Sequence, residues 1–398
     1  MKELVTKEVD GFLANSSMIR KMFEAGIELR KKFGAENVYD FSLGNPDVPP
    51  PAAVKAALKE IAEHADEPFA IGYMPNAGYP ATREALAKKV SEEQATAVPA
   101  SNIVVTCGAA GAINVLFRAV LSEGDEVICP SPYFVEYGFY AGNFGGKLVP
   151  VPTKLPNFNL DVEAIDAAIT PKTRAVIVNS PNNPTGQIYS REELAALGEV
   201  LAKHSEKNGR AIYLVSDEPY RALNFDGVEI PSVFSVYPAA VVIGSFSKTL
   251  SLAGERIGYV AVNPALEGSD KLMAALILTN RILGFVNAPA IAQKVLQTAL
   301  DSQVDIEIYR KRRDLMADVL RNAGVEFMMP KGAFYFFAKS PVEDERIFVE
   351  ALLQEHVLAV PGRGFGLPGY IRLAFCVEDS TIINSRDAFK RAVASLAK

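Results

Sequence analysis

Short apolar runs rich in β-branched residues alternate with helical stretches between about residues 100 and 260. The strand-like runs are Asn102–Thr106, Glu126–Cys129, Ala175–Val178, Ala211–Val215 and Val241–Gly244. Helical spacing of apolar residues is clear in Gly111–Leu121 and in Arg191–Lys203, which opens with a capping box at Ser190. Continuous apolar strands that alternate with helices are typical of a parallel sheet covered on both faces. We therefore predict an α/β fold with a mostly parallel central sheet.

The sequence changes in character after residue 285, and 398 residues are enough for two domains. Ala288–Leu320 is helical and densely charged, and the short strands Phe334–Ala338 and Tyr370–Phe375 follow around another helix. We predict a large domain over residues 45–285 and a smaller α+β domain built from residues 1–44 and 286–398.

The composition excludes several classes of protein. The net charge of -6 and the lack of a lysine- or arginine-rich run argue against binding to nucleic acid or to an anionic membrane. No apolar stretch approaches the roughly 18 residues of a membrane span, and the N-terminus lacks a signal-peptide core. The three histidines and three cysteines lack zinc-site spacing, so we expect no metal site. We predict a cytoplasmic protein.

Polar motifs follow the predicted strands, at the end where parallel sheets bind ligands. The small residues of Thr106–Gly111 open a helix and suit a phosphate, although a plain strand-to-helix turn would look the same. Tyr133 suits stacking on a planar heterocycle or burial in the core. Asn182 and Asn183 are neutral donors, suited to an anionic ring oxygen.

Two further motifs carry charge. Asp217 and Glu218 end an apolar strand, where burial is costly unless a cation pairs with them. A protonated pyridine nitrogen would be such a partner, and a helix N-cap is the alternative. Lys248 lies between Ser247 and Thr249, and Arg256 follows eight residues later. Hydroxyls and an arginine suit a phosphate dianion beside a nucleophilic lysine.

Together these motifs resemble the signature of class I/II aminotransferases, the fold-type I enzymes that depend on pyridoxal 5′-phosphate (PLP). The matching segments are Ser180–Gly186, Ser216–Tyr220, Ser245–Thr249 and Arg256–Gly258, and Asp217 stands 31 residues before Lys248. The resemblance, which is to the aspartate aminotransferase-like members, extends from Ser42 to Ala374. It implies a large domain with a mostly parallel sheet and a smaller α+β domain.

The resemblance also implies a role for each matching residue around the cofactor. Lys248 would bind PLP as a Schiff base, and Asp217 would pair with the pyridinium nitrogen. Asn183 and Tyr220 would bond the phenolate oxygen, and Tyr133 would stack on the ring. The phosphate would be held by Gly108, Ala109, Ala110, Ser245, Ser247 and Arg256. The catalytic residues would be Lys248, Asp217 and Tyr220.

Other positions correspond to substrate and subunit contacts. Arg372 would grip the substrate α-carboxylate in a fork, helped by Gly44 and Asn183. Tyr73 would reach the phosphate in the neighbouring subunit, which implies a homodimer with shared active sites. Arg281 would meet the second carboxylate of a dicarboxylic substrate, although a solvated arginine at a helix end explains it equally well.

The expected reaction moves an amino group from an L-amino acid, with aspartate as the best guess, to a 2-oxo acid such as 2-oxoglutarate. The expected mechanism is ping-pong. Alanine and aromatic amino acids are alternative donors. A PLP-dependent carbon–sulfur β-lyase and a cyclopropane-forming synthase use the same fold. A cofactor-binding regulator is disfavoured because no segment remains for a DNA-binding module.

Overall fold

The computed structural model describes residues 4–14 and 18–396, which fall into two compact units. The larger unit comprises Pro46–Ile308 and Pro330–Ala333, and the smaller comprises Met1–Asn45, Tyr309–Met329 and Phe334–Lys398. Among the helices of the described residues, none has the length and hydropathy needed to span a bilayer.

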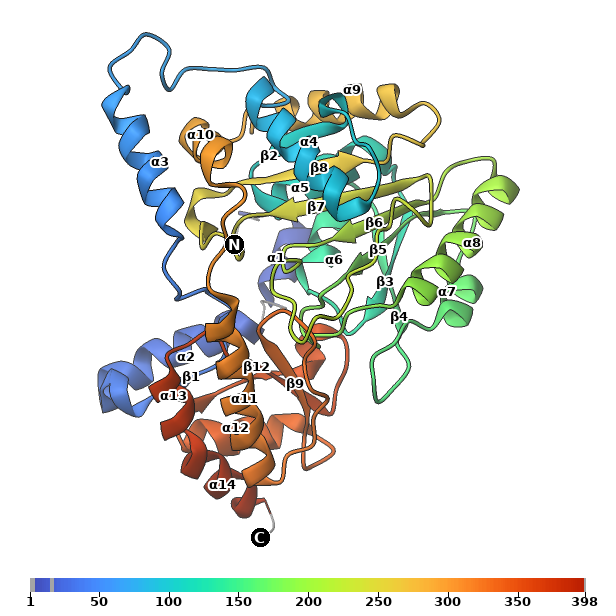
Figure 1. The fold of residues 1–398 in the computed structure, drawn as a ribbon. Coiled ribbons are helices and arrows are strands. Elements are labelled where there is room, and N and C mark those ends of the chain that lie inside the picture. Colours follow the sequence, from blue (N-terminus) through green and yellow to red (C-terminus); the bar gives the residue numbers. More distant parts are fainter. Residues whose placement is uncertain (1–3, 15–17, 397–398) are drawn as a thin grey trace. The chain divides into compact units, whose positions relative to one another are not determined.

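The larger unit contains a seven-stranded sheet in the order β2-β8-β7-β6-β5-β3-β4 (Figure 1). Its strands are β2 (Ile103–Thr106), β3 (Glu126–Ser131), β4 (Lys147–Pro152), β5 (Thr173–Asn179), β6 (Tyr213–Asp217), β7 (Ala240–Ser245) and β8 (Gly258–Val262). Only β8 runs against the others, because it pairs antiparallel with both β7 and β2. The predicted α/β fold with a mostly parallel sheet is therefore confirmed.

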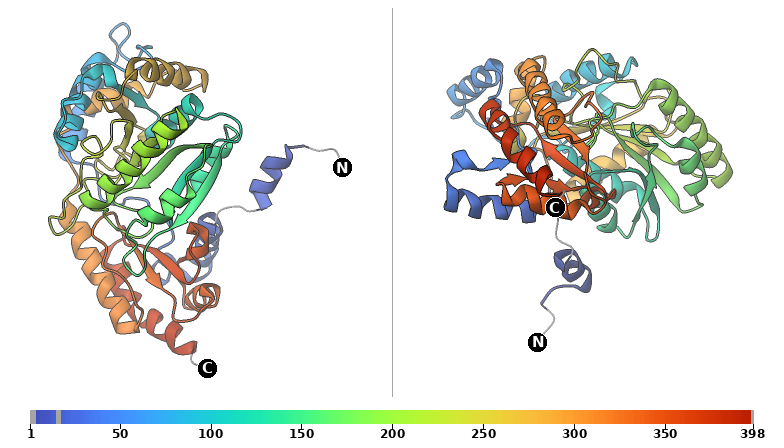
Figure 2. Two further views of the ribbon diagram at one scale, coloured as in Figure 1. Left: turned by 90° about the vertical axis from the view of Figure 1, so that its right-hand side faces the viewer. Right: turned by 90° about the horizontal axis from the view of Figure 1, so that it is seen from below.

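Helices lie on both faces of this sheet, and the left view of Figure 2 shows α8 crossing over the strands. They are α3 (Ala52–Glu63), α4 (Pro80–Gln94), α5 (Gly108–Val120), α6 (Glu136–Gly142), α7 (Val162–Ala168), α8 (Arg191–Asn208), α9 (Ser269–Ile282) and α10 (Ala290–Ala299). Helix α5 packs against β7 and β8, and α9 packs on α5. The predicted capping box of α8 is present, since Ser190 accepts from Glu193 N and Glu193 accepts from Ser190 N.

All five strands predicted between residues 100 and 260 are present, each shifted at its ends by no more than a few residues. The strands β4 and β8 were not predicted. The β8 segment begins two residues after Arg256, and its first residues belong to the Arg256–Gly258 motif.

The smaller unit has an antiparallel sheet in the order β11-β12-β9 and a short parallel pair, β1-β10. Its strands are β1 (Tyr39–Asp40), β9 (Tyr335–Lys339), β10 (Val357–Leu358), β11 (Val360–Pro361) and β12 (Tyr370–Ala374). Its helices are α1 (Lys7–Ala14), α2 (Met18–Phe33), α12 (Glu345–Gln354), α13 (Asp379–Asn384) and α14 (Arg386–Ser395). Buried phenylalanines fill its core, including the edge-to-face pair Phe336 and Phe375.

The division of the chain differs from the predicted boundary at residue 285. The helical segment Ala288–Leu320 forms two helices, α10, which ends at Ala299, and α11, which spans Ile306–Ala323. Helix α10 packs against α3 and α4, so it lies in the larger unit, and the unit boundary falls inside α11.

Candidate active site

A cavity of about 90 Å³ lies in the larger unit, at the carboxyl ends of the parallel strands. Its lining comprises Ala109, Ala110, Ile113, Phe134, Tyr140, Asn179, Asn183, Asp217, Pro219 and Tyr220. These residues follow β2, β3, β5 and β6, and the strand register pairs Asn179 with Asp217. The topology thus gathers polar groups from separate parts of the chain at one edge.

Asp217 is the acidic residue of this cavity, and it is only 5% exposed. Its Oδ2 accepts a hydrogen bond of 2.5 Å from the buried hydroxyl of Tyr137. Asn179 donates to the Asp217 carbonyl oxygen at 2.8 Å and, through its Oδ1, accepts from Asn183 N at 2.7 Å. The Oδ1 atom of Asp217 is buried and has no hydrogen-bond partner among the described residues.

The pKa of Asp217 is raised to about 7, chiefly by burial; the hydrogen bond from Tyr137 lowers the pKa and the nearby Glu218 raises it, and the value includes both effects. A buried carboxylate with one unpartnered oxygen is unfavourable in the absence of a cation. The position therefore suits a positively charged group in the cavity.

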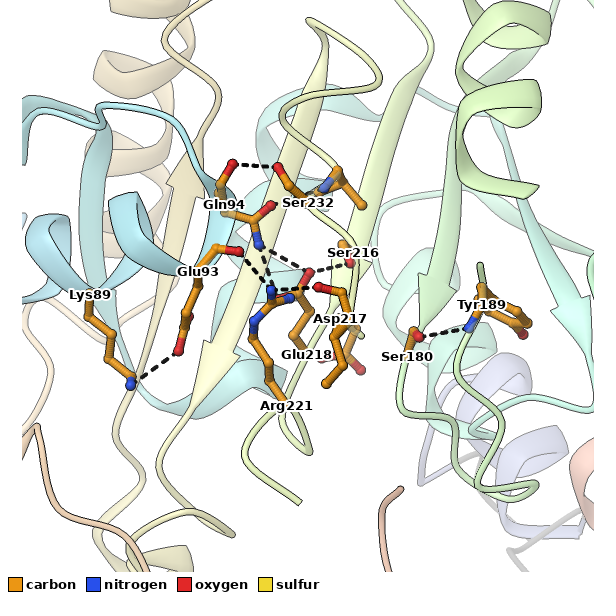
Figure 3. A network of polar contacts seen from close by, with 12 residues as sticks. Lys89, Glu93, Gln94, Ser180, Tyr189, Ser216, Asp217, Glu218, Arg221 and Ser232 are labelled. Carbon is orange, nitrogen blue, oxygen red and sulfur yellow. Dashed lines mark hydrogen bonds and ion pairs between the residues drawn. The ribbon is translucent and has the colours of Figure 1, made fainter. Parts of the chain in front are cut away.

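Glu218, the neighbouring carboxylate, follows the last residue of β6 and is not part of the cavity lining. It accepts hydrogen bonds from Arg221 at 2.9 Å and from Ser216 at 2.7 Å, as Figure 3 shows. Gln94 donates to the same carboxylate at 3.3 Å. Of the predicted acidic pair, only Asp217 is therefore available to a ligand in this cavity.

Groups suited to an anion meet beside the cavity. Gly108 begins α5 with φ of 72°, and a Cβ there would lie 2.9 Å from Nη2 of Arg256, so the turn favours glycine. Arg256 is exposed, and its Nη1 donates to the Ala253 carbonyl at 2.8 Å. Gly258 pairs with Thr106 on one side and with Ser245 on the other, which brings these strand ends together. The N-terminus of α5, the hydroxyl of Ser245 and the guanidinium of Arg256 together suit a phosphate.

The remaining predicted cofactor residues come from adjoining strand ends. Lys248 follows β7 and is half-buried, and Ser245 and Ser247 are buried and share a hydrogen bond of 2.9 Å between their hydroxyls. Asn183 and Tyr220 line the cavity directly.

The aromatic wall of the cavity differs from the sequence expectation. Phe134 and Tyr140 line the cavity, whereas Tyr133 does not. Tyr133 precedes Phe134 by one residue, and burial raises the pKa of its hydroxyl. Sequence reasoning also missed Tyr137, which lies 80 residues from its partner Asp217. The signal that could have found both was the run of aromatic residues from Tyr133 to Tyr140 directly after β3.

Arg372 lies in the smaller unit and is 2% exposed. Its guanidinium lies 4.7 Å from the ring centroid of Tyr335 and 4.6 Å from that of Phe365. Nη2 donates to the Ser42 carbonyl at 2.6 Å. A Cβ on Gly44 would lie 2.0 Å from the Tyr335 hydroxyl, so the close approach of this ring requires glycine there.

Tyr73 and Arg281 are both exposed, and the loop that follows Arg281 is held against the segment that follows Tyr73. Asn280 donates to the Asn76 carbonyl at 3.0 Å, and Asn287 donates to the Met74 carbonyl at the same distance. These segments border a second cavity of about 320 Å³, which Tyr73 lines and Arg281 does not. Arg281 lies in the last turn of α9.

The residues at the first cavity fit PLP, the cofactor that the sequence resemblance implies. A protonated pyridine nitrogen would give Asp217 Oδ1 the cationic partner that it lacks among the described residues. The phosphate would meet Arg256 and the N-terminus of α5, and the cavity wall of Ala109, Ile113 and Phe134 suits a flat ring.

We predict that Asp217→Asn stabilises the protein freed of bound ligand, and that the effect depends on pH. Because the folded-state pKa of about 7 exceeds the ordinary value of 3.8, wild-type stability falls as pH rises from 3.8 to 7. The asparagine variant does not lose stability in this way. Its free energy of unfolding should therefore exceed that of the wild type by up to about 4 kcal/mol at pH values above about 7, and this difference should vanish below about pH 4. Denaturation midpoints across this range measure the difference.

The exposed Asp301→Asn is the matched control and should show no such trend. A constant difference between Asp217→Asn and wild type at every pH would mean that Asp217 does not titrate in this window.

Comparison with known proteins identifies the family. The sequence model of the class I and II aminotransferases matches residues 35–389. A probable aspartate/prephenate aminotransferase of Aquifex aeolicus is 33% identical over 386 residues, covering 92% of this chain and 93% of the relative.

Solved structures agree in fold. An amino transferase of Eubacterium rectale has a TM-score of 0.95 at 38% identity and covers 100% of both chains. The aspartate aminotransferase of Thermus thermophilus, solved with maleate, has a TM-score of 0.87 at 32% identity and covers 98% of this chain and 100% of the other. The chain therefore belongs to the class I and II aminotransferases, which are PLP-dependent enzymes.

Proposed function

We propose that this aminotransferase transfers the amino group of a dicarboxylic L-amino acid, with aspartate as the preferred donor, to a 2-oxo acid such as 2-oxoglutarate. The observation that carries the PLP chemistry of this proposal is the buried Asp217 carboxylate, whose Oδ1 lacks a partner among the described residues. A cation held there by Asp217 is what an electron-withdrawing pyridinium requires.

PLP, when bound, supplies an electron sink for the pair released from the substrate Cα–H bond. Asp217 would keep the ring nitrogen protonated, and Tyr137 fixes Oδ2 so that Oδ1 would be left for that contact. Lys248 would hold the cofactor covalently, and its amine, once released, would serve as general base and acid at the substrate Cα. Asn183 and Tyr220, which line the cavity, would orient the ring, and Phe134 rather than Tyr133 would cover its face.

Arg372 binds the substrate α-carboxylate in this proposal. Its burial between two aromatic rings removes water from the guanidinium, and this strengthens a bidentate bond to a carboxylate. The donor leaves as a 2-oxo acid before the acceptor binds to the same groups, which is a ping-pong order.

The names of similar proteins support a dicarboxylic substrate. The Aquifex relative is named for aspartate and prephenate, and the Thermus structure contains maleate. Each of these three compounds carries two carboxylates. A second carboxylate requires a second cation, and Arg281 is a candidate because its side chain is exposed.

A homodimer with shared sites is the assembly that we propose. Tyr73 is 93% exposed and Phe69 is 91% exposed, and Ile71, Leu278 and Ile282 expose about half of their surface. Such a group of large apolar side chains favours an interface over contact with water. Burial of this surface by a second copy would also deliver Tyr73 and Arg281 to the neighbouring site. The cytoplasmic location expected from the sequence stays a prediction.

Borohydride reduction of the holoenzyme should attach the cofactor permanently to the peptide that contains Lys248. Lys248→Ala should abolish labelling and reduce turnover by orders of magnitude, because the covalent holder and proton carrier is removed. The exposed Lys271→Ala should label and react as wild type does. Labelling of another lysine in the wild-type protein would overturn the assignment.

Mixing Tyr73→Ala and Lys248→Ala subunits tests the shared site. Random pairing makes half of the dimers mixed, and each mixed dimer has one site with both wild-type residues. Recovered activity should therefore be about a quarter of the wild-type value. No recovery beyond that of the separate variants would show that Tyr73 serves its own chain.

Arg281→Ala should lower kcat/KM for aspartate. The corresponding loss of transition-state stabilisation should be about 2–5 kcal/mol, the cost of removing one partner of a desolvated charge pair. Alanine as donor should be nearly unaffected. Lys271→Ala, which removes an exposed cation from the same helix α9, is the control. Equal losses for all donors would contradict the role of Arg281 in binding the side-chain carboxylate. Separately, release of pyruvate without a 2-oxo acid acceptor would favour the β-lyase.

A further inference from the structure

The loop that joins β11 to β12 is tied to helix α12 by one buried carboxylate. Glu345, the first residue of α12, is 0% exposed. Its Oε1 accepts from Arg363 Nε at 2.7 Å, and its Oε2 accepts from Arg363 Nη2 at 3.0 Å. The backbone N–H of Arg363 donates to Oε1 at 3.2 Å, and that of Gly369 donates to Oε2 at 3.0 Å. One side chain therefore holds both ends of the loop 363–369.

The geometry of this pair is stronger than that of an ordinary surface ion pair. Two parallel bonds from the guanidinium fork to one carboxylate fix its orientation as well as its position. The backbone bonds and the N-terminus of α12 add favourable electrostatics to the buried charge. By comparison, Asp344 and Arg346, which flank Glu345, pair at 2.5 Å with the Arg346 side chain 62% exposed, and Asp344 also accepts from Nη2 of Arg363 at 2.9 Å.

Phe365 lies inside the tied loop and is 0% exposed. Its ring forms one wall of the slot that holds the Arg372 guanidinium, at 4.6 Å, and Tyr335 forms the other, at 4.7 Å. Tyr335 belongs to β9 and pairs with Ala374 of β12, whereas Phe365 lies in the loop 363–369 and makes an edge contact of 6.2 Å with Phe337. A shift of the loop would therefore release one side of the slot.

We propose that the Glu345–Arg363 pair is a positioning latch that fixes Phe365 and thereby orients Arg372 for the substrate carboxylate. Neither latch residue touches substrate; both act through the loop. The inference rests on the proposed role of Arg372 in substrate binding. A bidentate bond to a carboxylate requires the guanidinium plane to be set in advance, and an error of 1 Å is costly.

Arg363→Ala and Glu345→Gln in the holoenzyme test the latch, with Arg391→Ala as the matched control. The latch variants should raise KM for aspartate and Kd for maleate by about tenfold, because both ligands need an oriented Arg372, while kcat stays within about threefold. Arg363→Lys keeps the charge without the fork and should fall in between. Arg391→Ala loses an exposed ion pair with Glu355 at the other end of α12, which does not involve either latch residue, and should leave all three constants unchanged.

Two further measurements separate the latch from a merely structural staple and from the proposed function. Hydrogen exchange of residues 362–370 should be faster in Arg363→Ala. In a double-mutant cycle of Arg363→Ala with Arg372→Lys, the losses of maleate binding free energy should be less than additive, because the latch acts through Arg372. Unchanged KM and Kd with faster exchange, or fully additive losses, would overturn the latch alone. Unchanged maleate binding in Arg372→Lys would overturn the proposed role of Arg372, and the latch with it.

Discussion

The Asp217 carboxylate is buried at the end of β6, with Oδ2 bonded to Tyr137 and Oδ1 without a partner among the described residues. Burial of a carboxylate in this state is unfavourable for the folded chain, as its raised pKa reflects. The surrounding structure keeps it there all the same. Asn179 on the neighbouring strand and the Glu218–Arg221 pair behind it fix the strand end, so the unfavourable charge stays aimed at the cavity.

The same physical device occurs twice, with opposite signs of charge. Asp217 is a buried anion that selects a cation, and Arg372 is a buried cation that selects an anion. Each is held by neighbours that leave its orientation little freedom: a hydroxyl and an amide around Asp217, two rings and the Ser42 carbonyl around Arg372. Such preorganised charges lose little free energy to reorganisation when a ligand arrives. Arg256, which is exposed, suits a phosphate that is itself well hydrated.

The sequence was sufficient for the parts of the fold that have a local signal. Apolar β-branched runs located five strands, and the Ser190 capping box located the start of α8. Strand β8 was missed because its first residues belong to the Arg256–Gly258 motif, which has a chemical interpretation of its own. The boundary at residue 285 differed because contacts of α10 with α3 and α4 join segments more than 190 residues apart, and no local pattern reports them.

For the site, the motif resemblance named Asn183, Asp217 and Tyr220, which line one cavity, but it named Tyr133 rather than Phe134 and did not name Tyr137. Tyr133 and Phe134 are adjacent in sequence, and which of them faces the cavity depends on the backbone after β3. Tyr137 became a partner of Asp217 through a contact across 80 residues. The Glu345–Arg363 pair is likewise invisible in the sequence, since each residue alone reads as a surface charge.

These differences separate the type of reaction from the choice of substrate. The groups proposed to carry the chemistry, Asp217 and Arg372, are buried, and their neighbours constrain them from several sides. Arg281, the group proposed to select a dicarboxylate, lies exposed at the end of α9. An exposed arginine gains little from a carboxylate in water, because solvent screens the pair. It becomes selective only where a second surface excludes that water, so the assembly of two chains would determine the substrate more than the fold of one.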